Sequence, residues 1–494
     1  MIQEEKNEFQ ITKKERNNFL FGLSGQNIVY GLIGGSFFTY FLTDIALFPA
    51  IAVSILLIVG KLWDGINDPV VGSIVDKHTF KNGEKLRPLL KFTPIPVGIF
   101  TVLMFVVFPG SDKLLWLRIS YFVIMYLCWD IVYTMQDVGI WGITALITRN
   151  SLERDYIVKW ARTVGSCVFG IASAIIPMAL EIFVNSTGMS WQLATVVFAI
   201  IFGFGGALMS RKAAKAKERV PKQLTQGSMK ESFSLLFKNK ILLLLCLGNL
   251  LGSLAIGNNL VTYFFKYEIP AGILGTSVIG ALGLTTIFFA IITIPSFISM
   301  LFADKFKKLC KNNYINVIIV AQIIHAVFRV VAYFVGFEGN RLWITMALLA
   351  IAFFPTGAIS IAQTSLFNDS IDYLEWQTGK RTEGVTFSMQ TFFTKVASGI
   401  TQGGSMIALG ILGYKAIDAP NAVYVGTQSA AFDKWIWPLM ILTPAIAALL
   451  YIIPLFFIRY TNKQKALVEE DLRCRREGLP ESGESPFCKM TEVE

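Results

Sequence analysis

The feature that constrains this chain most is a series of about twelve apolar stretches, each near or above the ~20 residues that a helix needs to cross a bilayer. Lipid offers the backbone no hydrogen-bond partner, so a crossing segment must be helical or belong to a closed barrel. Stretches of this length favour helices, and we predict an all-α membrane protein with twelve transmembrane helices. They lie approximately at residues 18–44, 48–75, 89–109, 114–147, 157–185, 189–209, 240–266, 271–303, 313–337, 341–367, 385–413 and 435–460.

Composition supports this class. The chain is 54% hydrophobic and 16% charged, whereas soluble globular chains carry roughly 25% charged residues. We attribute its net charge of +10 to basic cytoplasmic loops rather than to nucleic-acid binding. Six cysteines without C-x-x-C spacing and only two histidines suggest neither a disulfide framework nor a zinc site. We therefore expect no cofactor.

The basic residues are unevenly divided between alternate loops. One set of loops, together with both termini, holds about 34 of the 44 lysines and arginines. The opposite set holds six, namely Lys113, Arg118, Lys266, Arg341, Lys415 and Lys434. Because cytoplasmic loops are enriched in lysine and arginine, this bias predicts that both termini are cytoplasmic. The expected location is the plasma (inner) membrane, crossed several times.

The longest basic connection follows the sixth stretch and divides the helices into two sets of six, the layout of the major facilitator fold. The second helix of each half ends in Asp-Lys, at Asp76-Lys77 and at Asp304-Lys305, which supports an internal repeat. We expect the tail to form a short surface helix and then to be disordered. The predicted segments are a cytoplasmic N-terminus 1–17, a six-helix bundle 18–210, a cytoplasmic linker 211–239, a second six-helix bundle 240–460 and a cytoplasmic tail 461–494.

The second stretch contains ionisable residues, each of which costs at least ~2.5–3.5 kcal/mol inside a bilayer unless it has a partner. Lys61, Asp64 and Asp68 are spaced i, i+3 and i+7, which places them on one helix face. Asn67 lies beside Asp64. Such hard oxygen ligands suit Na⁺, H⁺ or Li⁺, so we predict a cation site. Alternatively, the helix ends here and its acids are solvated, as we expect for Asp76.

The fourth stretch repeats this pattern. Asp130, Thr134 and Asp137 are spaced i, i+4 and i+7, and Trp141 follows one turn later. A carboxylate beside an indole is suited to a sugar, because the acid accepts hydroxyl hydrogen bonds and the ring packs on the apolar sugar face. Alternatively, Trp141 belongs to the aromatic belt at the membrane interface.

Two further cations lie within apolar stretches. We expect Arg162 and Lys395 to pair with the acids or contact the solute, although a snorkelling lysine is the alternative for Lys395. Arg329 and His325 share a face of the ninth helix, where hydrogen bonds between helices are expected. The polar neighbours of Lys395 that could face the same cavity are Gln390, Thr391 and Thr394.

Several of these motifs resemble one known family, the glycoside–pentoside–hexuronide:cation symporters, which have the two-bundle major facilitator fold. The motifs span most of residues 20–410 in the right order. They are Trp63-Asp64-Gly-Ile-Asn67-Asp68-Pro69-Val-Val-Gly72 with Asp76, Gly83-Glu-Lys-Leu-Arg87-Pro88, Tyr133-Thr134-Met-Gln-Asp137 with Trp141 and Arg162, Asn368-Asp369-Ser-Ile-Asp372-Tyr373-Leu-Glu375, Thr378-Gly379-Lys-Arg381-Thr-Glu383-Gly384, and Gln390-Thr391 with Lys395.

The resemblance implies two binding sites, and the charge pattern adds a gate. The implied cation site, for Na⁺ at Asp64 and Asp68 if sodium is the coupling ion, consists of Asp64, Asn67, Asp68 and Thr134. The implied substrate site consists of Asn27, Asp137, Trp141, Arg162, Gln390, Thr391 and Lys395. We expect cytoplasmic charges to form a network of ion pairs across the seam between the halves, each pair weak alone. These are Asp76, Arg87, Arg149, Arg154, Asp372, Arg381 and Glu383.

One position departs from the family pattern. The best-known member has a lysine and then an aspartate where this chain has Gln26-Asn27, and that aspartate accepts galactoside hydroxyls. The uncharged Asn27 makes galactoside specificity doubtful and favours an anionic solute, for which Arg162 and Lys395 would be counter-charges. An acidic glycoside such as a glucuronide is therefore one hypothesis.

The predicted function is secondary active transport: symport of a sugar or glycoside with Na⁺, H⁺ or Li⁺ by alternating access. The expected partners are the solute, a monovalent cation and the lipid bilayer, with no nucleic acid and a monomeric protein. One alternative is a lysolipid-type carrier of the same fold, which would need an aliphatic slot between the halves. An enzyme is disfavoured because no Gly-rich phosphate loop or nucleophile–base pairing stands out. A channel is disfavoured because the charges form no repeated ring.

Overall fold

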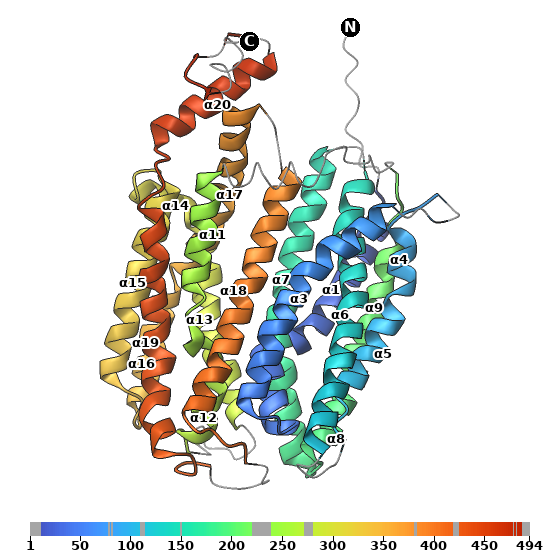
Figure 1. The fold of residues 1–494 in the computed structure, drawn as a ribbon, viewed down its shortest axis with the longest axis vertical. Coiled ribbons are helices and arrows are strands. Elements are labelled where there is room, and N and C mark those ends of the chain that lie inside the picture. Colours follow the sequence, from blue (N-terminus) through green and yellow to red (C-terminus); the bar gives the residue numbers. More distant parts are fainter. Residues whose placement is uncertain are drawn as a thin grey trace. The chain divides into compact units, whose positions relative to one another are not determined.

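The structure is a computed structural model in which the described residues form helices and no strand. Wherever the twelve predicted stretches fall on described residues they contain helix, although several consist of more than one helical segment (Figure 1). The residues described are 11–77, 80, 83–108, 114–148, 151–219, 239–270, 280–379, 383–417, 424–477, 479–480 and 482–486.

The N-terminal sequence half contains α1 (Lys13–Ile33), α2 (Ser36–Tyr40), the π-helix η1 (Phe41–Ile45), α3 (Ala50–Lys77), α4 (Arg87–Phe92), α5 (Pro94–Met104), α6 (Leu115–Leu146), α7 (Ser151–Thr187), α8 (Trp191–Phe198), the π-helix η3 (Ala199–Phe204), α9 (Gly205–Ser210) and the 3-10 helix η4 (Arg211–Lys215). The C-terminal half contains α11 (Lys240–Gly252), the 3-10 helix η5 (Ile256–Asn259), α12 (Val261–Tyr267), α13 (Ala281–Leu301), α14 (Ala303–Leu309), α15 (Tyr314–Val335), α16 (Arg341–Phe353), α17 (Thr356–Thr378), α18 (Glu383–Ile411), α19 (Ala430–Leu455) and α20 (Asn462–Glu477).

Length and composition confirm the membrane class. Over the described part of the chain, nine helical segments are long and apolar enough to cross a membrane, and two shorter apolar helices, α5 and α11, accompany them. One of the nine, Arg341–Thr378, joins α16 and α17. Many large apolar side chains on these helices are exposed, which is the surface that lipid tails cover in a membrane-spanning bundle.

The described residues divide into two compact units, which do not follow the sequence halves throughout. The first unit contains residues 1–225 together with 265–286 and 409–428, and the second contains 226–264, 287–408 and 429–494. The C-terminal sequence half therefore contributes the end of α12, the first turns of α13 and the end of α18 to the first unit.

Small residues allow close helix packing in the first unit. A Cβ atom on Gly22 of α1 would lie 2.3 Å from the backbone nitrogen of Ala213, and one on Gly25 would lie 2.5 Å from the carbonyl oxygen of Gly206. Helix α1 therefore meets both α9 and η4 backbone to backbone, as small residues permit in membrane bundles. The apolar core around this contact includes Phe19, Leu23 and Ile143.

In the second unit, Arg329 of α15 binds η5, the short segment that separates α11 from α12 within the seventh predicted stretch. Its guanidinium donates to the carbonyl oxygen of Met440 at 3.2 Å and to Asn258 Oδ1 at 2.8 Å. Its Nε donates to His325 Nε2 at 3.0 Å, and His325 Nδ1 lies 3.1 Å from the carbonyl oxygen of Ala352. The expected hydrogen bonds between helices are confirmed, because these four partners lie on η5, α15, α16 and α19.

The polar tail is only partly as predicted. Its helix, α20, is present and buries Val468 and Leu472 in the core of the second unit. The expectation of disorder directly after this helix is wrong for Ser482 and Ser485. The Ser482 hydroxyl donates to Asp471 Oδ2 at 2.8 Å, and the Ser485 hydroxyl donates to the carbonyl oxygen of Trp376 at 2.6 Å. Hydrogen bonds to a packed helix therefore hold residues that composition alone marks as disordered.

Candidate functional site

The polar side chains predicted on the second and fourth stretches meet between α3 and α6. Asn67 Nδ2 donates to Asp130 Oδ2 at 2.9 Å and to Thr134 Oγ1 at 3.2 Å. Thr134 Oγ1 lies 3.2 Å from Asp68 Oδ1, to which it donates. Asp64 completes the group. We call these residues, with Lys61, the carboxylate cluster: Lys61, Asp64, Asn67, Asp68, Asp130 and Thr134.

The carboxylate cluster contains three carboxylates and one ammonium group, and it is largely buried. Lys61 Nζ lies 3.0 Å from Asp64 Oδ2, with side chains 14% and 11% exposed. Asp130 is 1% exposed. Buried carboxylates are costly unless a positive charge or hydrogen-bond donors compensate them, and a bound cation is one group that can do so. Asp130 is not part of the site that the family resemblance implied, although its spacing on α6 pointed to it.

A second polar group joins α1 to α6. Gln26 Nε2 donates to Asp137 Oδ1 at 2.8 Å, and Gln26 is 2% exposed. Its neighbour Asn27 is half-buried and donates to the carbonyl oxygen of Leu23 within its own helix at 2.9 Å. The resemblance directed attention to the lost charge at Asn27 and missed Gln26, which makes the direct contact with Asp137.

The Trp141 ring and the Arg162 guanidinium are stacked, with the Arg162 Cζ atom 4.2 Å from the ring centroid. Trp141 is half-buried and Arg162 is exposed. A guanidinium over an indole is held by cation–π attraction without neutralisation of its charge. The structure thus brings together two of the residues predicted to contact the solute, Trp141 of α6 and Arg162 of α7.

Next to these groups, aromatic rings form a column that sequence reasoning missed. Tyr30 of α1 stacks on Tyr133 with ring centroids 5.6 Å apart, and Tyr133 stacks on Trp129 at 4.6 Å. Tyr126 continues the column, 6.3 Å from Trp129. The signal was available in the sequence, because residues 126, 129 and 133 recur at helical spacing on one face of α6.

The remaining predicted substrate residues lie on α18 and belong to the second unit. Gln390 and Lys395 are half-buried, and Thr391 is exposed. The carbonyl oxygen of Gln390 accepts from Thr394 Oγ1 at 2.8 Å. The grouping of these residues with those of the first unit stays a prediction.

The predicted cytoplasmic gate is described only in part. Arg87 Nη1 lies 2.6 Å from Glu84 Oε1, and its Nε donates to the carbonyl oxygen of Ala214 at 2.8 Å. Both contacts stay within the first unit. Arg154 is exposed and Asp372 is half-buried. Outside the described residues or side chains lie Asp76, Arg149, Arg381 and Glu383.

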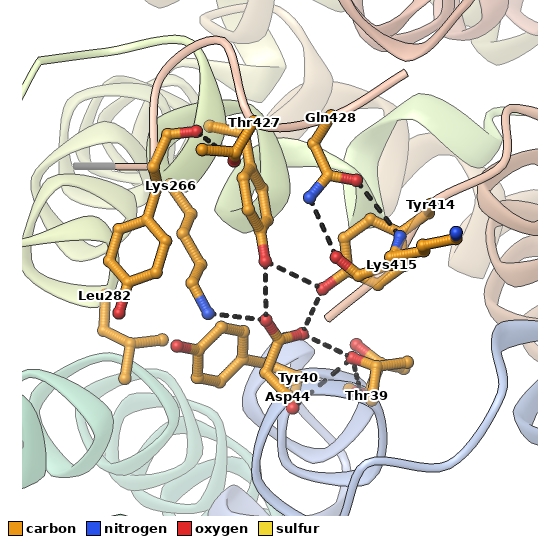
Figure 2. Close-up of polar contacts among 12 residues, drawn as sticks. Thr39, Tyr40, Asp44, Lys266, Leu282, Tyr414, Lys415, Thr427 and Gln428 are labelled. Atoms are coloured by element: carbon orange, nitrogen blue, oxygen red, sulfur yellow. Dashed lines mark hydrogen bonds and ion pairs between the residues drawn. The ribbon is translucent and has the colours of Figure 1, made fainter. Parts of the chain in front are cut away.

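A buried ion pair that was not predicted joins the two sequence halves within the first unit. Lys266 Nζ lies 2.6 Å from Asp44 Oδ1, with side chains 7% and 1% exposed. The Tyr267 hydroxyl donates to the same oxygen at 3.3 Å. Asp44 Oδ2 accepts from Tyr414 at 2.7 Å and from Thr43 at 2.7 Å. Figure 2 shows Lys266 and Tyr414 approaching Asp44 from separate parts of the chain.

We call these five residues the Asp44 cluster: Thr43, Asp44, Lys266, Tyr267 and Tyr414. Rings of Tyr40, Tyr267 and Tyr424 surround the Lys266 ammonium at 4.8–5.3 Å. The sequence carried a signal here too, since Asp44 is the only charged residue between Arg16 and Lys61, and a charged residue in such an apolar run needs a partner. Only the tertiary structure identifies that partner.

Comparison with known proteins places the chain among sugar transporters. The family model described as MFS/sugar transport protein matches residues 19–462. An uncharacterized symporter, YjmB, of Bacillus subtilis is 29% identical over 94% of this chain and 96% of its own length. A putative sulfoquinovose importer of Escherichia coli is 24% identical over 94% and 95%. An isoprimeverose transporter of Lactiplantibacillus pentosus is 25% identical over 80% of each chain.

Solved structures agree on the fold. A bacterial homolog of the human lysosomal transporter Spinster superposes with a TM-score of 0.63 at 14% identity, covering 90% of this chain and 98% of that one. A D-xylose–proton symporter superposes with a TM-score of 0.55 at 15% identity, covering 92% and 97%. The helical spans and these likenesses together establish the major facilitator fold, and the family model covers nearly the whole chain. The chain therefore belongs to the MFS/sugar transport protein family of the major facilitator superfamily.

Proposed function

We propose that this protein is a cation-coupled symporter of a sugar or glycoside that works by alternating access. The observation that carries the proposal is the carboxylate cluster, which holds three acids and one lysine between two membrane-spanning helices. A cation bound there relieves the repulsion between Asp64, Asp68 and Asp130. Membership of a sugar transport family supports the solute class.

The coupling cation in this proposal is Na⁺, with H⁺ or Li⁺ as substitutes. Asp64, Asp68, Asn67 and Thr134 supply carboxylate, amide and hydroxyl oxygens, which hard cations prefer. The Asn67 amide and the Thr134 hydroxyl hold the two helices in register. The cation replaces part of the role of the Lys61 ammonium in neutralising the acids.

The proposed solute site begins at Asp137, Trp141 and Arg162. Asp137 accepts solute hydroxyl groups and is oriented by Gln26, while the ring of Trp141 packs against a sugar face. Arg162 keeps its charge while stacked, which suits a carboxylate or sulfonate. The name of the sulfoquinovose importer, a relative of 24% identity, supports an acidic sugar or glycoside as the preferred solute. In the loaded state Gln390, Thr391 and Lys395 contact the solute from the other half.

Coupling arises because each ligand, once bound, raises the affinity of the protein for the other. Without cation, the acids engage Lys61 and other cationic groups. With cation bound, Asp137 and Arg162 are available to the solute, and the occupied site can pass through a closed state with little uncompensated charge. The linkage is reciprocal, so cation and solute must tighten each other's binding by the same factor.

In this proposal, ion pairs at the cytoplasmic side, including those of Arg87, Arg154 and Asp372, close the inner side of the transporter. The protein acts as a monomer, and both of its termini lie in the cytoplasm.

The test is transport by Asp68→Cys in reconstituted vesicles. We expect uptake driven by a cation gradient to be lost, because the cation loses a carboxylate ligand, while exchange of solute across the membrane persists. Asp433→Asn is a matched control, since Asp433 lies in the first turn of α19, outside the carboxylate cluster. Driven uptake that survives Asp68→Cys at the wild-type rate refutes the cation assignment.

A further inference from the structure

Two buried carboxylates of the N-terminal sequence half have no part in the proposed transport chemistry. Asp44 lies on the π-helix η1, and Glu181 lies near the end of α7. Counted over the whole residue, Asp44 is 6% exposed and Glu181 is 4% exposed. Both bind elements of the C-terminal sequence half, and all of these contacts lie within the first unit. Buried charges retained without a role in binding call for a separate explanation.

The hydrogen bonds of Asp44 saturate both of its carboxylate oxygens. One oxygen faces the Lys266 ammonium and the Tyr267 hydroxyl, and the other accepts from Thr43 and Tyr414. Three of these four partners come from the end of α12 and from the segment directly after α18, and they are more than 200 residues away in sequence. The ion pair is complete only while these helix ends remain against η1.

Glu181 binds the first turn of α13 in the same manner. Its Oε2 accepts the backbone N–H groups of Gly280 at 2.9 Å and Gly283 at 2.8 Å, and its Oε1 accepts that of Leu282 at 3.0 Å. A carboxylate at a helix N-terminus satisfies amides that have no partner within the helix and interacts favourably with the helix dipole. A Cβ on Gly280 would lie 2.8 Å from Glu181 Oε1, so a larger residue here would displace the carboxylate from its present position.

Close helix packing and a further hydrogen bond surround the Asp44 contact. The end of α18 meets the start of α3 closely, because a Cβ on Gly410 would lie 2.4 Å from Ile51 Cδ1. The Arg118 guanidinium donates to the carbonyl oxygen of Ala46, which ends η1. The loops at these helix ends contain few lysines and arginines, which is the mark of the outer face.

We propose that Asp44 and Glu181 form the outer gate of the transporter. Each carboxylate fastens the outer end of a helix from the C-terminal sequence half to the N-terminal half while the solute site communicates with the cytoplasm. Opening to the outside breaks both contacts and exposes the charged groups to water. Hydration then replaces the partner groups that each carboxylate has lost. This inference rests on the proposed alternating access, but it concerns residues that contact neither cation nor solute.

The experiment compares amide hydrogen–deuterium exchange of the full chain in lipid nanodiscs, without solute, for wild type, Asp44→Asn, Lys266→Met and the double variant. Each single variant leaves one buried charge without its partner, which disfavours the closed gate. We expect exchange in residues 41–45 and 261–267 to rise at least about tenfold, the equivalent of about 1.4 kcal/mol. The double variant should restore protection, because it buries no unpaired charge.

A reciprocal readout separates a gate from a local packing defect. If the outer gate opens, the cytoplasmic ends must close, so residues 372–378 of α17 should gain protection in the single variants. Glu15→Gln is the matched control. Glu15 pairs with Arg219 at 2.7 Å in the same unit, but it lies in the first turn of α1, whereas Asp44 follows the last turn of that helix. This change should leave exchange at residues 41–45 unaltered.

Glu181→Gln tests the second contact, and its result does not depend on whether the Asp44 variants fold. Loss of this carboxylate should raise exchange at residues 280–286 and again protect residues 372–378. Outer exchange that stays at the wild-type rate in all single variants, or rises without the cytoplasmic response, overturns the gate. Absence of solute uptake with these exchange patterns intact would instead count against the proposed function alone.

Discussion

The carboxylate cluster and the Asp44 cluster both bury charge within the first unit, yet they differ in balance. In the Asp44 cluster one carboxylate faces one ammonium group and three hydroxyls, and neither charged side chain is more than 7% exposed. In the carboxylate cluster three acids accompany one lysine. The protein itself neutralises the balanced pair, whereas we propose that a bound cation contributes to neutralising the acids of the carboxylate cluster. On this difference we propose that the Asp44 cluster serves closure and the carboxylate cluster serves cation binding.

The largest expected effect is on the free energy of unfolding, and it should distinguish Lys266 from Lys61. Lys266→Met leaves Asp44 buried without its cation and should lower the free energy of unfolding by about 3–5 kcal/mol, as for other broken buried pairs. Thermal or denaturant unfolding in detergent, with and without Na⁺, measures this loss. Na⁺ should not restore the loss, because the hydroxyls of Tyr267, Thr43 and Tyr414 already occupy both carboxylate oxygens of Asp44. Recovery in Na⁺ would contradict the distinction between the clusters.

Lys61→Met should behave differently, because the carboxylate cluster is the proposed site of an added cation. The variant should be destabilised in a Na⁺-free buffer, and saturating Na⁺ should recover much of the loss. Ligand at a hundred times its dissociation constant stabilises the folded state by about 2.7 kcal/mol. Melting curves across a Na⁺ series measure the recovery, with K⁺ as the control. Equal curves in Na⁺ and K⁺ would mean that the acids do not select the coupling ion.

Trp141→Ala sharpens the comparison between cation and solute. Removing the ring takes away the surface on which Arg162 stacks and on which the sugar is proposed to pack. Solute affinity should fall about tenfold, or roughly 1.4 kcal/mol, while Na⁺ affinity stays close to that of wild type. Calorimetric titration with each ligand measures both. A parallel loss of both affinities points to a structural role for the indole.

The smallest expected effect concerns selectivity at Asn27. Asn27→Asp adds a negative charge near Gly165 of α7, whose would-be Cβ lies 3.3 Å from Asn27 Nδ2. Preference should shift several-fold from acidic towards neutral galactosides, because an added carboxylate accepts hydroxyls and repels an anion. Competition uptake with paired neutral and acidic sugars measures the shift, and Asn27→Ser provides an uncharged control. Unchanged selectivity would place Asn27 away from the solute.

Local sequence spacing predicted much of the candidate site. The i, i+3, i+4 and i+7 positions on α3 and α6 identified Asp64, Asn67, Asp68 and Thr134, and the structure brings their two helices together through these residues. Spacing could not predict that Gln26 contacts Asp137, because that contact depends on how α1 packs against α6. Ser482 and Ser485 show the same limit, since their partners lie 11 and 109 residues away.

The sequence by itself determined the membrane class, the approximate helical spans and the helix faces that carry charge, because the cost of burying a polar backbone or a side-chain charge in lipid applies to each segment separately. The tertiary structure alone decided which charges meet. Asp44 and Lys266 are 222 residues apart, and nothing local to either residue encodes the other. Their pairing follows from the packing of α12 and α18 against η1, where a low dielectric makes an unpaired charge too costly to remain.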